Sequence, residues 1–380
     1  MRILLNDGKR SSTPTPVNAD IRLLHESMDG YLPSPLVNCP SLAERWDAAR
    51  ATVKVENDRW GLPSFKIVGT AWATVRALAH LLPATWTPSM GLAGLAGELP
   101  DELMLVAATE GNHGEALAHL ARLLAVQCRV FVSSEVSAST RSRIAAHGAE
   151  LVTVPGTYDD AVVMSAAHTD DPMTVVISDT SWNGYEEVPR AVADGYTTIL
   201  AELDDQLRAY GGAADVVVVP MGVGALASAV IKHYRGPTGH GGPVVVGVEP
   251  TSAACVMASL AAGRRLSIPG HLGSTMAGLN CGTPSLVAWP DLQTGLDAVV
   301  AVSDDEAESA RSLATEVDVA IGPCSRAAMA AADWILSGPA SSAARAALGI
   351  SAEPTVVVLA TDGPSGPPAP ASTKGSLTDG

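Results

Sequence analysis

The chain alternates short runs of β-branched residues with alanine-rich stretches of helical period, and this alternation constrains its fold more than any other feature. The runs predict strands over residues 51–55, 103–107, 129–132, 151–154, 174–178, 215–219, 244–248 and 355–359. The stretches predict helices over residues 68–82, 115–125, 139–147, 158–168 and 226–234. Repeated β-α units form an α/β fold of mostly parallel twisted sheets with helices on both faces. Ligands of such folds bind at the carboxyl ends of the strands, so we expect the chemistry in the loops that follow them.

Charge and hydrophobicity exclude several classes of protein. The 380 residues are 47% hydrophobic, which fits two packed domains rather than a disordered chain. Forty acidic against 24 basic residues give a net charge of −16, which repels the phosphates of nucleic acids and of anionic membranes. The apolar runs fall short of the roughly 20 residues of a membrane span, and the N-terminus lacks the apolar core of a secretory signal. We therefore expect a cytoplasmic protein with a small-molecule partner.

The cysteines give no sign of a disulfide framework or a metal site. They are odd in number and scattered, and none has a second cysteine or a histidine at zinc-ligand spacing; they are Cys39, Cys128, Cys255, Cys281 and Cys324. Free thiols and no bound metal are expected.

The first candidate binding loop runs from the predicted strand 215–219 through Gly222 and Gly224 into a helix. Backbone N–H groups at a helix start attract anions together with the helix dipole, and glycine lets the backbone approach a ligand closely. The loop therefore favours a phosphate cradle. Because its G-x-G-x-x-A pattern is followed by Glu249 at the end of the next strand, it also fits a dinucleotide-binding fingerprint. A plain strand-to-helix turn without a ligand is the third interpretation.

The second candidate loop has the sequence Thr-Glu-Gly-Asn-His-Gly over residues 109–114, between a predicted strand and a predicted helix. Thr109 and Asn112 offer side-chain and backbone donors that suit a carboxylate or a ring oxygen. The alternative is an ordinary turn with His113 at the start of the helix.

Lysine is scarce, with five residues in the chain, so few candidates exist for lysine-dependent chemistry. Lys9 lies in an arm over residues 1–20 and Lys374 in a Pro/Ser/Gly-rich tail over residues 364–380, both expected to be flexible. A solvated helix position explains Lys232, and a solvent-facing edge of a strand explains Lys54. Lys66 is different, because a helix start and apolar neighbours both disfavour its ammonium form and would lower its pKa enough to favour Schiff-base chemistry. The alternative for Lys66 is a surface lysine that extends along its helix.

Three segments in this order, 53–66, 109–114 and 222–226, resemble the cofactor signatures of the fold-type II pyridoxal-phosphate enzymes, which include tryptophan synthase β chains, cysteine synthases and serine/threonine dehydratases. Three further segments, 158–162, 179–189 and 275–282, resemble one member family, diaminopropionate ammonia-lyase. The resemblance covers roughly residues 20–363. It implies a two-domain fold with a large cofactor-binding domain of residues 1–65 and 190–380, a small domain of residues 66–189, and an assembly as a homodimer.

The resemblance also implies how pyridoxal phosphate is held. Lys66 would form the Schiff base, Asn112 would contact the ring oxygen, and Thr361 would face the ring nitrogen. A neutral hydroxyl at that nitrogen favours β-elimination over transamination. The phosphate would be bound by Gly222, Val223, Gly224, Ala225 and Leu226.

For catalysis, the resemblance implies an α,β-elimination of ammonia from 2,3-diaminopropionate, giving aminoacrylate and then pyruvate. Lys66 would be the base, Asp179 and Glu110 the acids, and the substrate carboxylate would be bound by the loop residues Thr109, Glu110, Gly111 and Asn112. Glu110 departs from the family, which usually has aspartate there. The longer side chain moves the charge by about one methylene, and a misplacement of about 1 Å can cost on the order of a hundredfold in rate, so the substrate is open to change.

Several interpretations therefore stay open. Within the cofactor class, the alternatives are β-replacement or a serine/threonine-type dehydration in a specialised pathway. From another class, an NAD-dependent oxidoreductase would use the Gly222–Gly224 loop with Glu249, and a non-catalytic homologue is the fourth possibility. The substrate enantiomer, a monovalent-cation requirement and a disulfide between Cys255 and Cys281 are also open.

Overall fold

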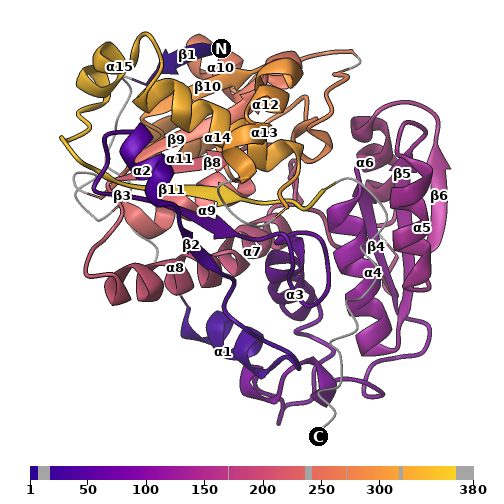
Figure 1. Cartoon of the computed structure of the whole chain (residues 1–380). Coiled ribbons are helices and arrows are strands. Elements are labelled where there is room, and N and C mark those ends of the chain that lie inside the picture. Colours follow the sequence, from indigo (N-terminus) through magenta and orange to yellow (C-terminus); the bar gives the residue numbers. More distant parts are fainter. Residues whose placement is uncertain (7–17, 170, 236–241, 271, 316–319, 365–380) are drawn as a thin grey trace, which may run out of the picture.

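The structure is a computed structural model and describes residues 1–6, 18–169, 171–235, 242–270, 272–315 and 320–364. Its described strands form a seven-stranded and a four-stranded sheet (Figure 1). Most of the predicted arm and tail, including Lys9 and Lys374, lies outside the described residues. The first residues of the predicted flexible arm are ordered: they form a strand that pairs antiparallel with residues 298–301.

The larger sheet has the strand order β1-β10-β9-β8-β11-β3-β2. Its strands are β1 (Arg2–Leu5), β10 (Ala298–Val302), β9 (Val244–Pro250), β8 (Val216–Pro220), β11 (Thr355–Ala360), β3 (Arg50–Val55) and β2 (Leu36–Asn38). The five central strands are parallel, and β1 and β2 pair antiparallel at the two edges. This confirms the mostly parallel α/β fold.

Both faces of the larger sheet are buried, as β8 illustrates. Val216 and Val218 belong to one core cluster, and Val217 and Val219 belong to the other, because side chains alternate between the faces of a strand. The first cluster is covered by α2 (Pro40–Arg45), α12 (Asp304–Ser309), α13 (Arg311–Ala314), α14 (Pro323–Leu336) and α15 (Ser341–Leu348). The second is covered by α8 (Thr197–Ala209), α9 (Ala225–Tyr234), α10 (Cys255–Ala262) and α11 (Trp289–Gly295).

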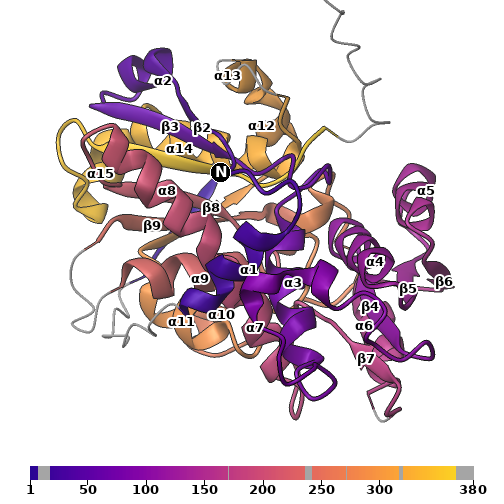
Figure 2. The same cartoon turned by 90° about the horizontal axis from the view of Figure 1, so that it is seen from below.

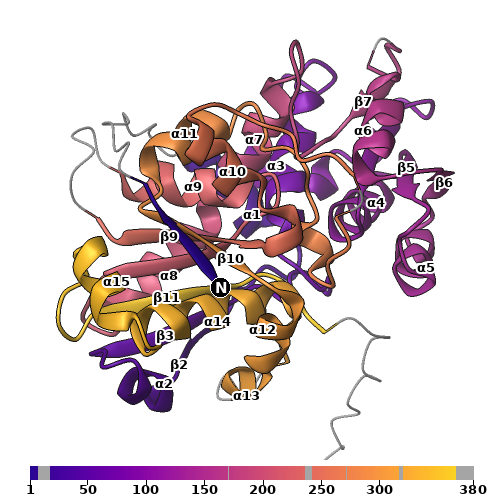
Figure 3. The same cartoon turned by 90° about the horizontal axis from the view of Figure 1, so that it is seen from above.

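The smaller sheet has the order β6-β5-β4-β7 and is parallel throughout. Its strands are β4 (Met104–Thr109), β5 (Gln127–Ser133), β6 (Glu150–Val154) and β7 (Thr174–Val176), and its helices are α4 (Asn112–Leu124), α5 (Ala138–Ala146) and α6 (Tyr158–Ala166). Figures 2 and 3 show these elements together at one end of the molecule. The domain boundaries at residues 66 and 189 stay a prediction.

Helix α3 (Lys66–Ala77) lies between the two parts of the molecule. It packs against α4 of the smaller sheet and against α7 (Glu187–Gly195), and also contacts α1 (Ala19–Ser27). Short 3-10 turns complete the fold, at Pro88–Met90, Leu92–Gly94, Thr251–Ala253 and Ala277–Leu279. The predicted helix over residues 68–82 is thus present but begins at Lys66, which places that side chain on the first helical position. Among the described residues, no helix combines the length and the apolar character needed to span a membrane.

The expected solvent-facing position of Lys54 is wrong. Strand β3 is not an edge strand, and the Lys54 side chain is fully buried. Its Nζ donates to the Ser34 carbonyl at 2.8 Å, to Glu202 at 2.9 Å and to Gln206 at 3.0 Å. A buried ammonium group requires such partners, and here they come from helix α8 and from the segment before β2. Lys232 is half-buried rather than fully solvated.

Candidate active site

A cavity of about 1150 Å³ lies where several strands of both sheets end. Its walls include residues that directly follow β4, β8 and β11, and residues of the loop after β3. Every residue that was predicted to take part in the site lines it: Lys66, Thr109, Glu110, Gly111, Asn112, Asp179, Gly222, Val223, Gly224, Ala225, Leu226 and Thr361. The fold therefore brings together segments that are up to about 300 residues apart in the chain, at the strand ends where ligands were expected.

Lys66 is held by an ion pair across the cavity wall. Its Nζ donates to Asp179 Oδ2 at 2.6 Å, and its side chain is 18% exposed. Burial alone would lower the pKa of Lys66, but the Asp179 carboxylate more than offsets this and raises it above its ordinary value. The expectation of a lowered pKa is therefore wrong for the protein without cofactor, because no local pattern reveals a carboxylate that lies 113 positions away.

Asp179 is fixed by two donors. Tyr158, the first residue of α6, donates its hydroxyl to Asp179 Oδ1 at 3.2 Å, and Lys66 occupies the other oxygen. Although burial disfavours a charge there, the Lys66 ammonium and these hydrogen bonds hold the pKa of Asp179 well below its ordinary value. Asp179 is thus an ionised carboxylate that orients the Lys66 amine, and it does not hold the proton that its predicted role as an acid requires. Sequence reasoning assigned Tyr158 no role, although it lies in a segment that resembles the family.

Glu110 has the opposite environment. Its carboxyl is partly buried and forms no hydrogen bond or ion pair with another residue of the described ranges. Burial, together with the nearby charges of Glu135 and Asp159, raises the pKa of Glu110 to about 7. A second cavity of about 170 Å³ is also lined by Glu110, Glu135 and Asp159. Glu110 is therefore a group that can hold and release a proton near neutral pH.

The loop that carries Glu110 is closed by Thr109. Its hydroxyl accepts hydrogen bonds from the N–H groups of Gly111 at 2.8 Å and Gly114 at 3.0 Å. Gly111 has a φ of +149°, and a Cβ there would come within 2.8 Å of the Thr140 side chain, which favours glycine. Because the Gly111 N–H is used within the loop, the expected carboxylate site retains the other N–H groups of the loop and the Asn112 amide.

The glycine loop fits a phosphate group. Gly224 has a φ of +93°, and a Cβ there would lie 2.5 Å from Leu292. At Gly222 a Cβ would meet the Gly278 carbonyl oxygen at 2.8 Å. Helix α9 begins at Ala225 and has no side-chain cap, so its first N–H groups remain available to an anion. Close packing and uncapped donors together make this loop suitable for the phosphate of a cofactor.

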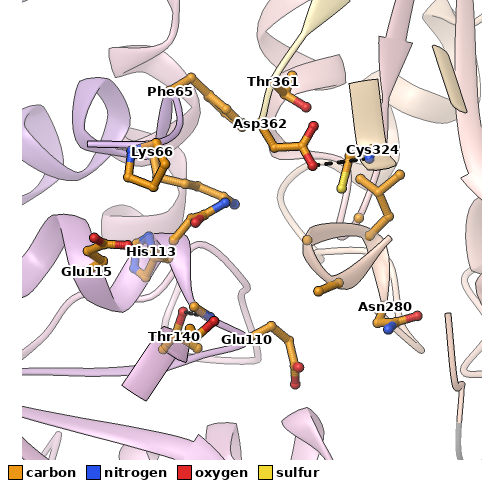
Figure 4. A pocket seen from close by; sticks show the side chains of 18 of the residues that line it. Phe65, Lys66, Glu110, His113, Glu115, Thr140, Asn280, Cys324, Thr361 and Asp362 are labelled. Atoms are coloured by element: carbon orange, nitrogen blue, oxygen red, sulfur yellow. Dashed lines mark hydrogen bonds between the residues drawn. The ribbon is translucent and has the colours of Figure 1, made fainter. Parts of the chain in front are cut away.

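The far side of the cavity carries Thr361, Asp362 and Cys324, opposite Lys66 (Figure 4). Thr361 directly follows β11 and is 5% exposed. Asp362, which sequence reasoning missed, caps helix α14 by accepting from the N–H groups of Cys324 at 3.1 Å and Ser325 at 2.9 Å. The cap fixes the segment that presents Thr361, and an aspartate directly after the predicted site residue was the available signal.

Glu249 does not join this site. It lies in β9, is fully buried, and accepts hydrogen bonds from the N–H groups of Val256 and Met257 at the start of α10. The dinucleotide interpretation therefore loses the acidic residue on which it depended. All five cysteines, Cys255 and Cys281 included, are free buried thiols. Within the described ranges, no three His, Cys, Asp or Glu side chains are arranged to hold a metal ion.

Comparisons with known proteins agree with this geometry. A family model described as "Pyridoxal-phosphate dependent enzyme" matches residues 28–362. Diaminopropionate ammonia-lyase of Salmonella typhimurium is 29% identical over 295 residues, which cover 76% of this chain and 73% of that protein. The Escherichia coli enzyme of the same name is 28% identical over 289 residues, covering 75% and 72%. Its crystal structure with an aminoacrylate–pyridoxal-phosphate reaction intermediate has a TM-score of 0.83 and 25% identity, covering 95% of this chain and 93% of that one.

Proposed function

The chain belongs to the family of pyridoxal-phosphate-dependent enzymes, and from this premise we propose that it is a lyase that eliminates ammonia from 2,3-diaminopropionate or a close β-substituted amino acid. The products are aminoacrylate and, after its hydrolysis, pyruvate and ammonia. One observation carries the proposal: a single cavity holds Lys66 paired with an ionised Asp179, and also holds Glu110 with a pKa near neutrality.

The cofactor would be held by groups from both sheets. Lys66 provides the covalent link, and the uncapped start of α9 with residues 222–226 binds the phosphate. Asn112 would contact the ring oxygen, and Thr361 would face the ring nitrogen. When bound, pyridoxal phosphate delocalises the electron pair left at the substrate Cα after its proton is removed.

The chain's own residues move the protons. Lys66 accepts the proton from Cα, and Asp179, an ionised carboxylate hydrogen-bonded to the same amine, orients it and stabilises the positive charge that it gains. Glu110 donates a proton to the departing β-amine. Two carboxyl groups whose environments push their pKa values in opposite directions suit such a division of roles. The loop 109–112 binds the substrate carboxylate.

A second candidate is a changed substrate or outcome within the same chemistry, either β-replacement or dehydration. The observation that favours it is Glu110 itself, which lies where the family usually has aspartate and borders the second cavity. A homodimer and a cytoplasmic location are further parts of the proposal, supported by the family resemblance and by the free thiols. Light scattering of the purified protein tests the dimer.

The test of the function starts from the visible spectrum of the protein with pyridoxal phosphate, before and after borohydride. We expect an absorption band in the wild type and in Lys232→Ala, a control lysine on α9 outside the cavity, but not in Lys66→Ala. Pyruvate release from D- and L-diaminopropionate is measured on the same three proteins. A band without pyruvate from either isomer favours the changed substrate, and the absence of a band in the loaded wild type contradicts the proposal.

A further inference from the structure

The side chain of Tyr196, between α7 and α8, has no assigned role and is unusual in the cavity wall. It is fully buried, yet its hydroxyl has no hydrogen-bond partner among the described residues. Burial raises the pKa of Tyr196, so the group is a neutral hydroxyl. Buried polar groups are nearly always hydrogen-bonded, because an unmade bond costs free energy. An unpartnered hydroxyl in the wall of a binding cavity therefore points to a partner in the loaded enzyme.

The packing around Tyr196 fixes its ring against the helix turn that carries Lys66. The ring contacts Phe65, one residue before Lys66, with centroids 4.8 Å apart. On Gly69, three residues after Lys66, a Cβ would lie 2.5 Å from Tyr196 Cε1. Gly195 allows the same approach from the other helix, since a Cβ there would lie 2.8 Å from the Gly69 Cα. Two glycines thus let α3 and α7 pack so closely that the phenol is fixed beside the first turn of α3.

The candidate partner for the Tyr196 hydroxyl is the Lys66 amine, because both residues line the same cavity and Tyr196 packs against the first turn of α3, where Lys66 lies. The Lys66 charge lowers the pKa of Tyr196 and the Asp179 charge raises it. In the protein without cofactor, the Lys66 Nζ donates to Asp179 Oδ2 at 2.6 Å instead. A lysine nitrogen joined to the cofactor loses the three N–H donors of an ammonium group and can become an acceptor, which suits a neutral hydroxyl that has a proton to donate.

We propose that Tyr196 is a positioning residue whose hydroxyl donates a hydrogen bond to the Lys66 nitrogen in the cofactor-loaded enzyme. This bond would fix the nitrogen at the position from which, once released, it takes the proton of the substrate Cα. The inference rests on the proposed role of Lys66 in binding the cofactor, but not on the identity of the substrate.

The experiment compares Tyr196→Phe with the wild type, both with and without pyridoxal phosphate, because phenylalanine keeps the ring packing and removes only the hydroxyl. Without cofactor we expect an unchanged or higher melting temperature, since an unpartnered hydroxyl is lost. With cofactor we expect a melting temperature lower by about 2 °C, the size of one lost hydrogen bond in a protein of this length. On a substrate that the wild type converts to pyruvate, kcat should fall roughly tenfold with KM unchanged.

The control is Tyr185→Phe, whose hydroxyl donates to the Val176 carbonyl and accepts from the Ser178 N–H outside the cavity. It should lower both melting temperatures equally. In a Lys66→Ala background, Tyr196→Phe should lose its cofactor-dependent effect.

Three results would overturn the inference: equal melting shifts with and without cofactor, a rise in KM alone, or a cofactor-dependent effect that persists without Lys66. If the wild type releases no pyruvate but the melting contrast is seen, the proposed substrate fails and the role of Tyr196 stands.

Discussion

Replacing Glu110 by glutamine tests the electrostatics of the cavity through stability alone. The pKa of Glu110 is raised from 4.5 to about 7 by burial and by the nearby Glu135 and Asp159. Since one pKa unit corresponds to about 1.4 kcal/mol, ionising Glu110 costs roughly 3 to 4 kcal/mol more in the folded protein than in the unfolded chain. The unfolded chain therefore loses this proton first as the pH rises, and the contribution of Glu110 to the unfolding free energy falls between pH 4.5 and about 7.

Glutamine carries no titrating proton, so the unfolding free energy of Glu110→Gln lacks the loss that Glu110 causes as the pH rises. Urea unfolding of the protein without cofactor, from about pH 4.5 to 8, should show the variant gaining about 3 kcal/mol relative to the wild type across that range. Glu102→Gln, at an exposed position, is the control and should run parallel to the wild type. If Glu110→Gln also runs parallel, the carboxyl is solvated in the folded protein and the argument for a neutral Glu110 fails.

The same substitution tests the assigned role of Glu110 as an acid. In the wild type, kcat/KM should decline as the pH passes about 7, where Glu110 of the free enzyme loses its proton. Glu110→Gln should lower kcat by a factor on the order of 10² to 10⁴ and abolish this decline. Glu110→Asp restores the charge in the shorter family form, so a higher rate on diaminopropionate than in the wild type would identify the glutamate as an adaptation to another substrate.

Contacts in the site and in the core lead to three more predictions. Tyr158→Phe removes the hydrogen bond to Asp179 and should raise the pKa of that carboxyl and loosen its hold on the Lys66 amine, which is measured as a loss of kcat of about tenfold with KM unchanged. Lys54→Met leaves Glu202 buried with one cation fewer and should lower stability by about 3 to 5 kcal/mol in urea unfolding, whereas an unchanged midpoint would mean that water replaces the ammonium group. Gly224→Ala requires a strained φ and displaces Leu292, so it should weaken pyridoxal-phosphate binding in a spectroscopic titration while Gly263→Ala, with open space around it, does not.

The sequence sufficed for those parts of the fold and site that depend on local pattern. The alternation of period 2 and period 3.6 locates strands and helices, and the parallel fold then places the loops after β4 and β8 at one edge. Lys66 could be selected because few lysines compete with it. The edge strands β1 and β2 and the interior strand β10 were not predicted. Strands β1 and β2 are short and are stabilised by pairing with β10 and β3, which no local pattern reveals.

The charge state of the site could not be read from the sequence, because it depends on contacts between distant segments. The pKa of Lys66 is raised instead of lowered since Asp179, on the loop after β7, reaches its amine. Lys54 was misplaced for the same reason, as Glu202 on α8 supplies its counter-charge. Local sequence determines which ionisable groups reach the end of a strand, whereas the tertiary fold determines which of them meet.

The two acids of the cavity differ because the fold surrounds them with opposite charges. Asp179 faces a lysine and a phenol hydroxyl, which stabilise its charge, while Glu110 has acidic neighbours, which destabilise its charge. Exchanging aspartate for glutamate at position 110 leaves this contrast intact, because burial and the neighbouring charges create it. The exchange instead moves the proton donor by about 1.5 Å, the length of a carbon–carbon bond. Since Glu110 also borders the second cavity, we expect the longer side chain to change which β-substituents the site accepts.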